Sequence, residues 1–421
     1  MNIIVIGSGG REHTVIKKLA QSPEITKIYA LPGNGGIAAD AECVNIGATD
    51  IDGIVDFAKD HDIGYAVVTP DDPLALGAVD RLNEIGIPCF GPTAAAAQIE
   101  ASKVFSKNLM KKYGIPTAAF EVFENAEDAL RYVKTAPLPT VIKADGLALG
   151  KGVIIAETRE DAVSAVKSIM EDGVFGKSGN RIVVEEFLTG PEVSVLAFTD
   201  GTTVKPMVSS MDHKRAHDGD EGLNTGGMGT VAPNPYYTAD IADVCMNTIF
   251  LPTIKAMKEE GREFRGCLYF GLMLTPNGPK VIEYNCRFGD PETQVVLPLL
   301  ESDLFTVMKA TTNGTLAETE VKFSDGAACC VVLASNGYPE KYEKGYEITI
   351  PDEIDGEVYV AGAKLDDGKL LTNGGRVLGA VATADDLKTA VKKAYAVADK
   401  IEFGNKYCRR DIGARALKAI K

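Results

Sequence analysis

Short apolar runs alternate with amphipathic stretches along the first hundred residues. Runs typical of buried strands lie at 3–6, 27–31, 65–69 and 87–90, and segments with helical spacing separate them. This order is typical of a parallel sheet whose strands are joined by crossover helices. The pattern therefore predicts an N-terminal parallel α/β unit, which we assign to residues 1–102.

A second series of elements begins with a helix predicted at 102–113, which Gly114 and Pro116 end. The later predicted elements are strands at 120–123, 140–143, 153–157, 182–187 and 375–382, and helices at 159–170, about 241–260 and 385–400. After about residue 325, the pattern predicts strands together with one long helix. We therefore expect a separate α+β region at 325–421.

Composition agrees with a large folded protein. Of the 421 residues, 45% are apolar and 24% are charged, so an extensive core can form. No run of 18 apolar residues predicts a membrane span. Lys and Arg number 44 against 59 Asp and Glu, a net charge of −15, which disfavours nonspecific binding to nucleic acid or to an anionic membrane. An anionic ligand must then be held by a local site.

The first strand starts at Asn2, which leaves no room for a leader peptide, so we expect a cytoplasmic protein. The eight cysteines form no C-x-x-C pair. The adjacent Cys329 and Cys330 would point to opposite faces of a strand. We interpret the cysteines as reduced core residues rather than as zinc ligands or disulfides.

The first strand runs into a glycine-rich turn with Gly7, Gly9 and Gly10. Free N–H groups at the start of the following helix can bind a phosphate. However, Glu12 stands where the third glycine of a dinucleotide motif belongs, and strand 27–31 ends without a ribose-binding acid. The turn alone leaves three possibilities: a phosphate site, a purely structural turn, or a dinucleotide site.

A second glycine-rich loop follows the strand at 140–143. Lys143 ends this strand, and Gly146, Gly150 and Gly152 come after it. Such a loop can fold over phosphates, although it lacks the Walker A spacing. The alternative is a mobile hairpin with solvated lysines.

Strand alternation places Glu283 and Asn285 on one face and Tyr284 on the other. A carboxylate and an amide oxygen are ligands that suit magnesium beside phosphates. Arg287 and Asp290 follow directly. This is more charge than is usual where an apolar strand ends. These residues favour a binding site over a solvated turn.

The segment 212–230 is long, polar and rich in glycine. Loops of this length inside a compact domain are uncommon unless they are functional, although an exposed flexible loop is the alternative. His13, His61 and His217 show no metal-ligand spacing, so we interpret them as surface or hydrogen-bonded histidines.

Taken together, these motifs resemble the phosphoribosylamine–glycine ligases, also called glycinamide ribonucleotide synthetases, which are ATP-grasp enzymes of purine biosynthesis. The resemblance covers essentially the whole chain. The matching motifs are 7–13, 32–34, 142–152, 185–188, 212–215, 224–229, 287–294 and 409–413.

The resemblance implies a multidomain α/β and α+β architecture. It consists of a Rossmann-like domain at 1–102, an ATP-grasp region at 103–324 with a mobile lid at about 119–190, and a small C-terminal α+β domain at 325–421. The implied reaction joins glycine to 5-phosphoribosylamine through glycyl phosphate, giving glycinamide ribonucleotide, ADP and phosphate. ATP and Mg²⁺ or Mn²⁺ are the implied cofactors. We expect a monomer or weak oligomer whose partners are these small molecules, without nucleic acid or membrane.

The resemblance also implies roles for individual residues. For ATP binding they are Lys103, Lys143, Gly150, Lys151, Gly152, Glu185, Glu186, Phe187, Leu188 and Glu192. For substrate binding they are Gly9, Gly10, Arg11, Asp71, Asp212, Asn224, Thr225, Gly226, Gly227, Met228 and Arg376. For catalysis they are Arg287, Asp290 and Lys214, and for metal binding Glu283 and Asn285.

Three departures from the family pattern stand out. Asp71 occupies the place of a glutamate expected to contact substrate, so we expect different ribose contacts there. The strand before Glu283 offers only 271–273, Gly-Leu-Met, where many ATP-grasp enzymes have a second metal-binding acid. Cys286 and Cys408 replace a small apolar residue and an aromatic one, which we interpret as packing variation.

Three other functions stay open from the sequence. A nicotinamide-dependent dehydrogenase would use the first glycine turn, but it gives no role to Glu283, Asn285 or Arg287. A non-catalytic nucleotide sensor would not need all the phosphoryl-transfer residues that the chain retains. A related ATP-grasp ligase with another amine or acid substrate is the nearest alternative.

Overall fold

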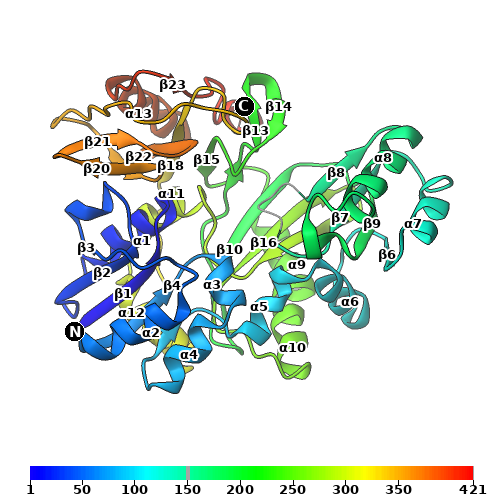
Figure 1. The fold of residues 1–421 in the computed structure, drawn as a ribbon, viewed down its shortest axis with the longest axis horizontal. Helices are drawn as coiled ribbons and strands as arrows, with labels where there is room; N and C mark the ends of the chain where they lie inside the picture. Colours follow the sequence, from blue (N-terminus) through cyan, green and yellow to red (C-terminus); the bar gives the residue numbers. More distant parts are fainter. Residues whose placement is uncertain (148–151, 421) are drawn as a thin grey trace.

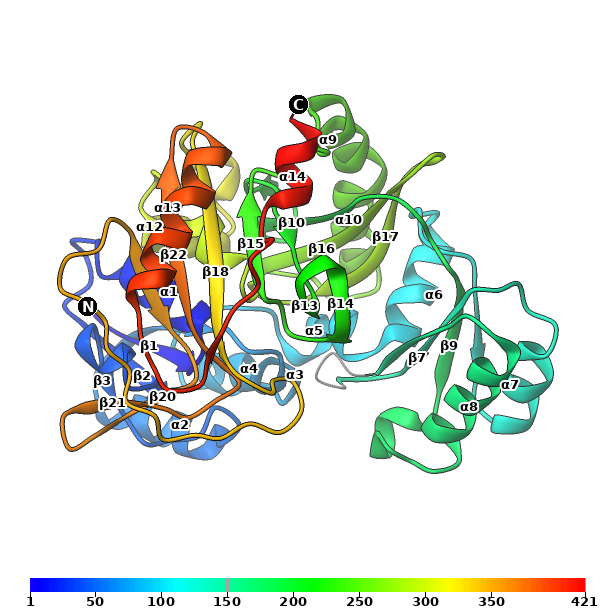
Figure 2. The same cartoon turned by 90° about the horizontal axis from the view of Figure 1, so that it is seen from above.

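The computed structural model describes residues 1–147 and 152–420. Figure 1 shows the N-terminal part in blue beside the C-terminal part in orange and red, with the central part in green. A smaller part, drawn in teal, projects from this body, and Figure 2 shows the same separation from above. Among the described residues, no helix has both the length and the apolar character needed to cross a membrane.

The N-terminal part is a parallel sheet covered by helices, as predicted. Its strands are β1 (Asn2–Gly7), β2 (Lys27–Pro32), β3 (Glu42–Cys43), β4 (Ile63–Val68) and β5 (Cys89–Phe90), in the order β3-β2-β1-β4-β5. The helices are α1 (Gly10–Leu19), α2 (Ile51–Asp60), α3 (Asp71–Ala75), α4 (Ala78–Glu84) and α5 (Ala94–Ala101). Ile3 and Ile4 lie in different core clusters, so β1 is buried on both faces.

The central part is an antiparallel sheet with the order β11-β10-β16-β17. Its elements are β10 (Glu192–Thr199), β11 (Val204–Pro206), β16 (Gly266–Thr275), β17 (Gly278–Asn285) and the helix α6 (Lys103–Tyr113). The predicted helix at 241–260 consists of α9 (Ala239–Cys245), a π-helical segment (Met246–Phe250) and α10 (Leu251–Glu259). Phe250 and Phe270 pack with ring centroids 4.2 Å apart, so this helix covers the face of β16.

The projecting part has its own sheet and its own core. The sheet runs β6-β9-β7-β8, and its elements are β6 (Phe120–Phe123), β7 (Thr140–Ala144), β8 (Val153–Ala156), β9 (Ile182–Glu186), α7 (Ala126–Val133) and α8 (Arg159–Met170). Thr158 and Asp161 cap the start of α8 reciprocally, at 3.1 and 3.2 Å. Val133, Ile142 and Ile169 belong to a core cluster of this part alone, so it can form one packed unit.

The C-terminal sheet recruits strands from the middle of the chain. Its strands are β12 (Met211–Asp212), β15 (Gly229–Ala232), β18 (Ala327–Ser335), β22 (Arg376–Ala384), β19 (Glu357–Val360) and β23 (Lys406–Tyr407). The helices are α11 (Thr293–Val296), α13 (Leu387–Lys400) and α14 (Ala414–Ala419). The hairpins are β13 (Arg215–His217) with β14 (Glu221–Asn224) and β20 (Ala363–Asp366) with β21 (Lys369–Thr372). A further helix, α12 (Leu304–Asn313), packs against the N-terminal sheet. Because β15 pairs with β18, this sheet spans the expected boundary at 324/325. The domain boundaries at 102/103 and 324/325 and the lid at about 119–190 stay predictions.

The predicted environment of the cysteines is largely confirmed. Cys329 and Cys330 are both buried but belong to different core clusters, one on each face of β18. All eight cysteines are free thiols. Cys43 is exposed and Cys408 is half-buried, so these two are not core residues.

Candidate active site

Strand β17 presents its polar residues as the alternation predicts. Tyr284 is buried, and its hydroxyl lies 2.9 Å from the hydroxyl of Thr253 on α10. Glu283 points the other way, with 37% of its side chain exposed and its Oε1 3.7 Å from Nζ of Lys214. Burial raises the pKa of Glu283, but the charges of Lys214 and of two further lysines outweigh it and hold this pKa below its ordinary value. The carboxylate is thus kept ionised.

Arg287 is fixed by a carboxylate that the sequence analysis missed. Its guanidinium donates to Glu100 on α5 at 3.0 Å and to Oδ1 of Asn285 at 3.2 Å. Glu100 also accepts a hydrogen bond from the backbone N–H of Cys286 at 2.8 Å. Burial raises the pKa of Glu100, although the charge of Arg287 opposes this. The pair lies 187 residues apart in the chain, so no local pattern could have indicated it.

Two lysines contact one buried glutamate at the base of the projecting sheet, and a third lysine lies one turn away on the same helix as Lys107. Glu185 on β9 contacts Lys107 at 2.9 Å and Lys143 at 3.1 Å, and the side chains of Lys107 and Glu185 are each 3% exposed. Lys103, one turn before Lys107 on α6, donates to the carbonyl of Gly146 at 2.8 Å. Burial lowers the pKa of Lys103 and lowers that of Lys107 to about 8. Lys107 was missed, although its i,i+4 spacing from Lys103 on the predicted helix was a usable indication.

After the buried Glu185, the rest of the predicted adenine-contacting segment lies at the surface. Glu186 pairs with Lys280 at 2.7 Å and accepts from the backbone of Ala119 at 3.0 Å. Phe187 is 39% exposed and Leu188 is half-buried. The predicted residues Gly150 and Lys151 lie outside the described residues, whereas Gly152 is buried and its carbonyl accepts from the N–H of Ala144 at 2.8 Å.

Lys214 joins the predicted nucleotide residues to the predicted substrate residues. Its Nζ lies 3.5 Å from Glu192 and 3.7 Å from Glu283, and these two carboxylates raise its pKa well above the ordinary value, against the effect of burial. Burial and the charge of Glu292 raise the pKa of Asp212 well above its usual range. Burial likewise raises the pKa of Glu292, whose Oε1 accepts from Tyr269 at 3.2 Å. The site therefore has buried acids beside a firmly charged amine.

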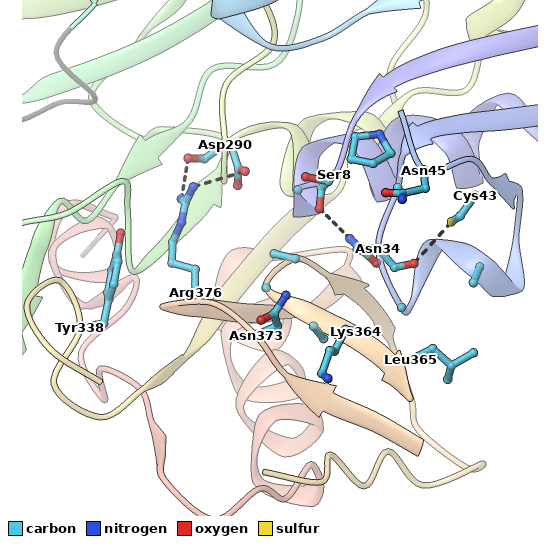
Figure 3. A pocket seen from close by; sticks show the side chains of 18 residues that line it. Ser8, Asn34, Cys43, Asn45, Asp290, Tyr338, Lys364, Leu365, Asn373 and Arg376 are labelled. Atoms are coloured by element: carbon cyan, nitrogen blue, oxygen red, sulfur yellow. Dashed lines mark hydrogen bonds and ion pairs between the residues drawn. The ribbon is translucent and has the colours of Figure 1, made fainter. Parts of the chain in front are cut away.

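A cavity of about 730 Å³ opens between the N-terminal and C-terminal parts. Figure 3 shows Arg376 reaching from the start of β22 to Asp290 across this cavity. The Arg376 guanidinium lies 3.3 Å from the Asp290 carboxylate and also donates to the carbonyls of Gly226 at 2.7 Å and Asp290 at 2.8 Å. Although burial opposes it, Arg376 holds the pKa of Asp290 below its ordinary value.

The first glycine turn lines the same cavity, but part of its anion-binding capacity is taken by the protein itself. The Glu12 carboxylate accepts from the N–H of Gly9 at 2.5 Å at the start of α1. It also pairs with Arg11, whose guanidinium donates to the carbonyl of Phe288 at 3.2 Å. A Cβ on Gly10 would lie 2.8 Å from the side chain of Gln294, so this position is tightly packed. Glu12 thus occupies space that a dinucleotide pyrophosphate would need.

The 224–228 segment packs against both β13 and the C-terminal part. Asn224 is exposed at the end of β14, and Thr225 donates to the carbonyl of Lys214 at 2.8 Å. A Cβ on Gly227 would lie 2.7 Å from the Asp212 carboxylate, and φ is +112° there, which favours glycine. Met228 is fully buried, and its N–H donates to the carbonyl of His213 at 2.8 Å.

Comparison with known proteins accounts for this arrangement. Models of phosphoribosylglycinamide synthetase match the chain in series, the N domain at 1–100, the ATP-grasp (A) domain at 101–293 and the C domain at 328–415. The phosphoribosylamine–glycine ligase of Halalkalibacterium halodurans is 47% identical, over 99% of this chain and 97% of its own. The chain belongs to the phosphoribosylamine–glycine ligase family.

Solved structures agree with this assignment. The crystal structure of phosphoribosylamine–glycine ligase from Thermotoga maritima superposes with a TM-score of 0.86 at 36% identity, covering 98% of this chain and all of that one. A biotin carboxylase from Campylobacter jejuni matches with a TM-score of 0.76 at 14% identity, over 97% and 92% of the two chains, and shows the shared fold alone. The predicted ATP-grasp fold class, family and ligase activity of purine biosynthesis are therefore confirmed, and the dehydrogenase alternative is wrong.

Two departures from the family pattern now have a structural description. Gly271 on β16 lies opposite Glu283 on β17, and a Cβ on Gly271 would be 3.0 Å from Cγ of Glu283. Among residues 1–147 and 152–420, no cluster of three or more His, Cys, Asp or Glu side chains could hold a metal. Asp71 begins α3, half-buried, and its negative charge helps to raise the pKa of both Glu100 and Arg287.

Proposed function

We propose that the chain joins the carboxyl group of glycine to the amine of 5-phosphoribosylamine at the expense of ATP. Glycine would first be phosphorylated to glycyl phosphate, and the amine would then displace phosphate to give glycinamide ribonucleotide. The observation that carries this substrate assignment is the 47% identity to a named phosphoribosylamine–glycine ligase over nearly both full chains. The position of Lys214 between Glu283 and the 224–228 segment supports it.

We assign the binding of the ATP phosphates to Lys103 and Lys143. Lys103 and Lys143 supply positive charge beside the loop that follows β7, and transfer of a phosphoryl group requires such charge. Glu185 to Leu188 would contact adenine and Glu192 the ribose. Gly150, Lys151 and Gly152 would cover the phosphates.

The donor set at the end of β17 fits Mg²⁺ or Mn²⁺. Glu283 supplies an ionised carboxylate and Asn285 an amide oxygen, and Mg²⁺ commonly takes one or two protein ligands together with phosphate oxygens and water. A metal there would neutralise phosphate charge. With Gly271 opposite Glu283, this side of β16 offers no second acid, so we propose that the protein supplies only these two ligands.

We assign stabilisation of the reacting groups to Arg287 and Lys214. Glu100 and Asn285 hold the Arg287 guanidinium, so it needs no reorganisation when charge develops on the transferring phosphoryl group. Lys214 stays protonated and faces Glu283 from the substrate side. Asp212 lies beside Lys214 in the chain and would contact the substrate amines.

The cavity between the first glycine turn and Arg376 is our proposed site for the sugar phosphate. Gly9 lines one side of this cavity, and Asp290 with Arg376 lines the other. Gly10 and Arg11 follow Gly9 at the start of α1, and we assign them to the same phosphate site. Asn224 to Met228 would close it toward glycine. Asp71, near Arg287, would contact the ribose.

The assay for this function measures ADP release with ATP, Mg²⁺ and freshly generated phosphoribosylamine, with and without glycine, together with detection of glycinamide ribonucleotide. We expect glycine-dependent ADP release, with one product molecule for each ADP. ADP release that does not depend on glycine, or that accompanies another product, would contradict the substrate assignment. Membership of the ligase family would still hold. We also propose a cytoplasmic monomer or weak oligomer without nucleic acid or membrane partners, which sizing of the purified chain would check in part.

A further inference from the structure

One motif has no role in the function proposed above. Residues 409–413 match the family, yet Arg409 lies outside the cavity and its side chain is only 1% exposed. Its guanidinium binds both carboxylate oxygens of Asp411, at 2.7 and 2.8 Å. It also donates to the carbonyl of Arg215 and to the carboxylate of Asp220, both at 3.0 Å. A buried guanidinium that makes four hydrogen bonds fixes the position of the chain segments that carry its partners.

Two of the partners of Arg409, Arg215 and Asp220, lie on the β13–β14 hairpin, and the third, Asp411, binds the hairpin in turn. Asp411 accepts a further hydrogen bond from the N–H of Gly219 at 2.9 Å, and the N–H of Arg410 donates to Asp218 at 2.8 Å. Tyr407 donates to the carbonyl of Ala216 at 2.9 Å. The C-terminal segment 407–411 therefore holds strand β13 and the turn of this hairpin through polar contacts.

The hairpin has little else to hold it. Within Arg215–His217 and Glu221–Asn224, only Ala216 is buried, and β13 and β14 pair with each other alone. An isolated two-stranded hairpin is at best marginally stable in water. The contacts with 407–411, together with an ion pair between Asp220 and Arg415 at 3.3 Å, therefore decide its position.

This hairpin connects two groups of proposed substrate residues. Lys214 precedes β13 directly, and Asn224 ends β14 just before Thr225 and Gly226. Figure 2 shows β13 and β14 beside the red C-terminal segment. The C-terminal segment also contacts His213, which directly precedes Lys214. His213 accepts a hydrogen bond from the N–H of Gly413 at 3.2 Å and donates one to the carbonyl of Gly229 at 3.0 Å. A displacement of the hairpin would shift Lys214 before β13 and the 224–228 segment at the end of β14.

We propose that Arg409 is a positioning residue that holds the β13–β14 hairpin, and thereby fixes Lys214 and the 224–228 segment for the glycine and amine substrates. It acts without touching substrate. Its effect on substrate binding rests on the proposed function. Its effect on the hairpin does not.

The test compares Arg409→Met with Arg409→Lys and with the neighbouring control Arg410→Met. The Arg410 side chain is exposed and pairs with Asp399, away from the hairpin. We expect Arg409→Met to raise the KM values for glycine and phosphoribosylamine roughly ten-fold or more, with less than about a three-fold change for ATP. Arg409→Lys should recover part of this loss because it keeps the charge but not the forked geometry. Arg410→Met should match the wild type.

Hydrogen exchange of the amides at 215–224 supplies a readout that needs no substrate. Arg409→Met should accelerate this exchange at least ten-fold while the amides of β18 stay protected. Unchanged exchange in the hairpin would overturn the proposal, and so would equal increases in all three KM values. If Arg409→Met does not fold, Asp220→Asn weakens the contacts of this carboxylate with Arg409 and Arg415 and should show the same pattern more weakly. Wild-type protein that makes no glycinamide ribonucleotide would instead refute the proposed function.

Discussion

The two halves of the candidate site are built in different ways. In the nucleotide half, Lys103, Lys107, Lys143 and Glu185 all lie between positions 103 and 185, and Lys107 and Lys143 both contact the Glu185 carboxylate. In the substrate half, the cavity is bounded by segments as distant as Gly9 and Arg376, and its walls are mostly loops. The nucleotide half can therefore be recognised from neighbouring motifs, whereas the substrate half exists only when the N-terminal and C-terminal parts are in contact.

The halves also differ in how charge is balanced. The nucleotide half has an excess of lysines, and burial lowers the pKa of two of them, which suits a site that receives a polyanion. In the substrate half the buried acids Asp212 and Glu292 have raised pKa values, while Arg376 and Asp290 compensate each other. Lys214 lies where the halves meet.

The largest effect on activity should come from Glu283, which faces Lys214 where the two halves meet. We expect Glu283→Ala to lower kcat roughly 10²–10³-fold or more, the scale of losing one preorganised electrostatic group at a reaction centre. The fold should survive, because Glu283 is partly exposed. The measurement is steady-state turnover with circular dichroism as the folding check. Glu121→Ala, an exposed carboxyl on β6, is the control and should keep full activity. Wild-type turnover in Glu283→Ala would remove the proposed metal role.

An intermediate effect should be confined to the substrate half. Arg376→Met removes charge-assisted hydrogen bonds to Asp290 and Gly226, and such bonds contribute about 1.5–3 kcal/mol each, so the KM for phosphoribosylamine should rise roughly 10–100-fold. The KM for ATP should change little. Lys369→Met, which removes an exposed ion pair with Glu347, is the matched control. An equal rise in both KM values would contradict the division into two halves.

The smallest effect concerns stability at the edge of the substrate half. Burial and the charge of Arg409 lower the pKa of His213 to about 4. Because an unfolded histidine binds its proton near pH 6.5, the unfolded state binds more protons between pH 6.5 and 4, and the free energy of unfolding should fall as the pH falls through this window. Between pH 7 and 5 this loss should be about 2 kcal/mol.

Denaturant unfolding of the wild type and of His213→Gln at pH 7 and 5 checks this loss. Carboxylates titrate in both proteins, so the difference between them isolates His213. Equal losses of stability in the two proteins would mean that His213 is not held neutral. The nucleotide half should not respond to this substitution, and an altered KM for ATP at pH 7 would contradict the separation.

Strand and helix patterns predicted much of the nucleotide half. Alternation placed Glu283 opposite to Tyr284, and the structure confirms it because Tyr284 is buried against Thr253. The predicted helix at 159–170 has the same bounds as α8. Glu100 could not be found in this way, because it lies on helix α5 and its partner Arg287 follows the end of β17, 187 residues later in the chain.

The sequence by itself determined the local elements of this protein: the parallel order of the first strands, the glycine turn before α1 and the polar face of β17. It did so because side-chain periodicity and backbone freedom act over a few residues. Only the tertiary structure decided that Glu100 holds Arg287, that Arg376 faces Asp290 and that Arg409 holds the β13–β14 hairpin. Such pairs depend on which segments pack together, since buried charges need partners that burial itself brings within reach.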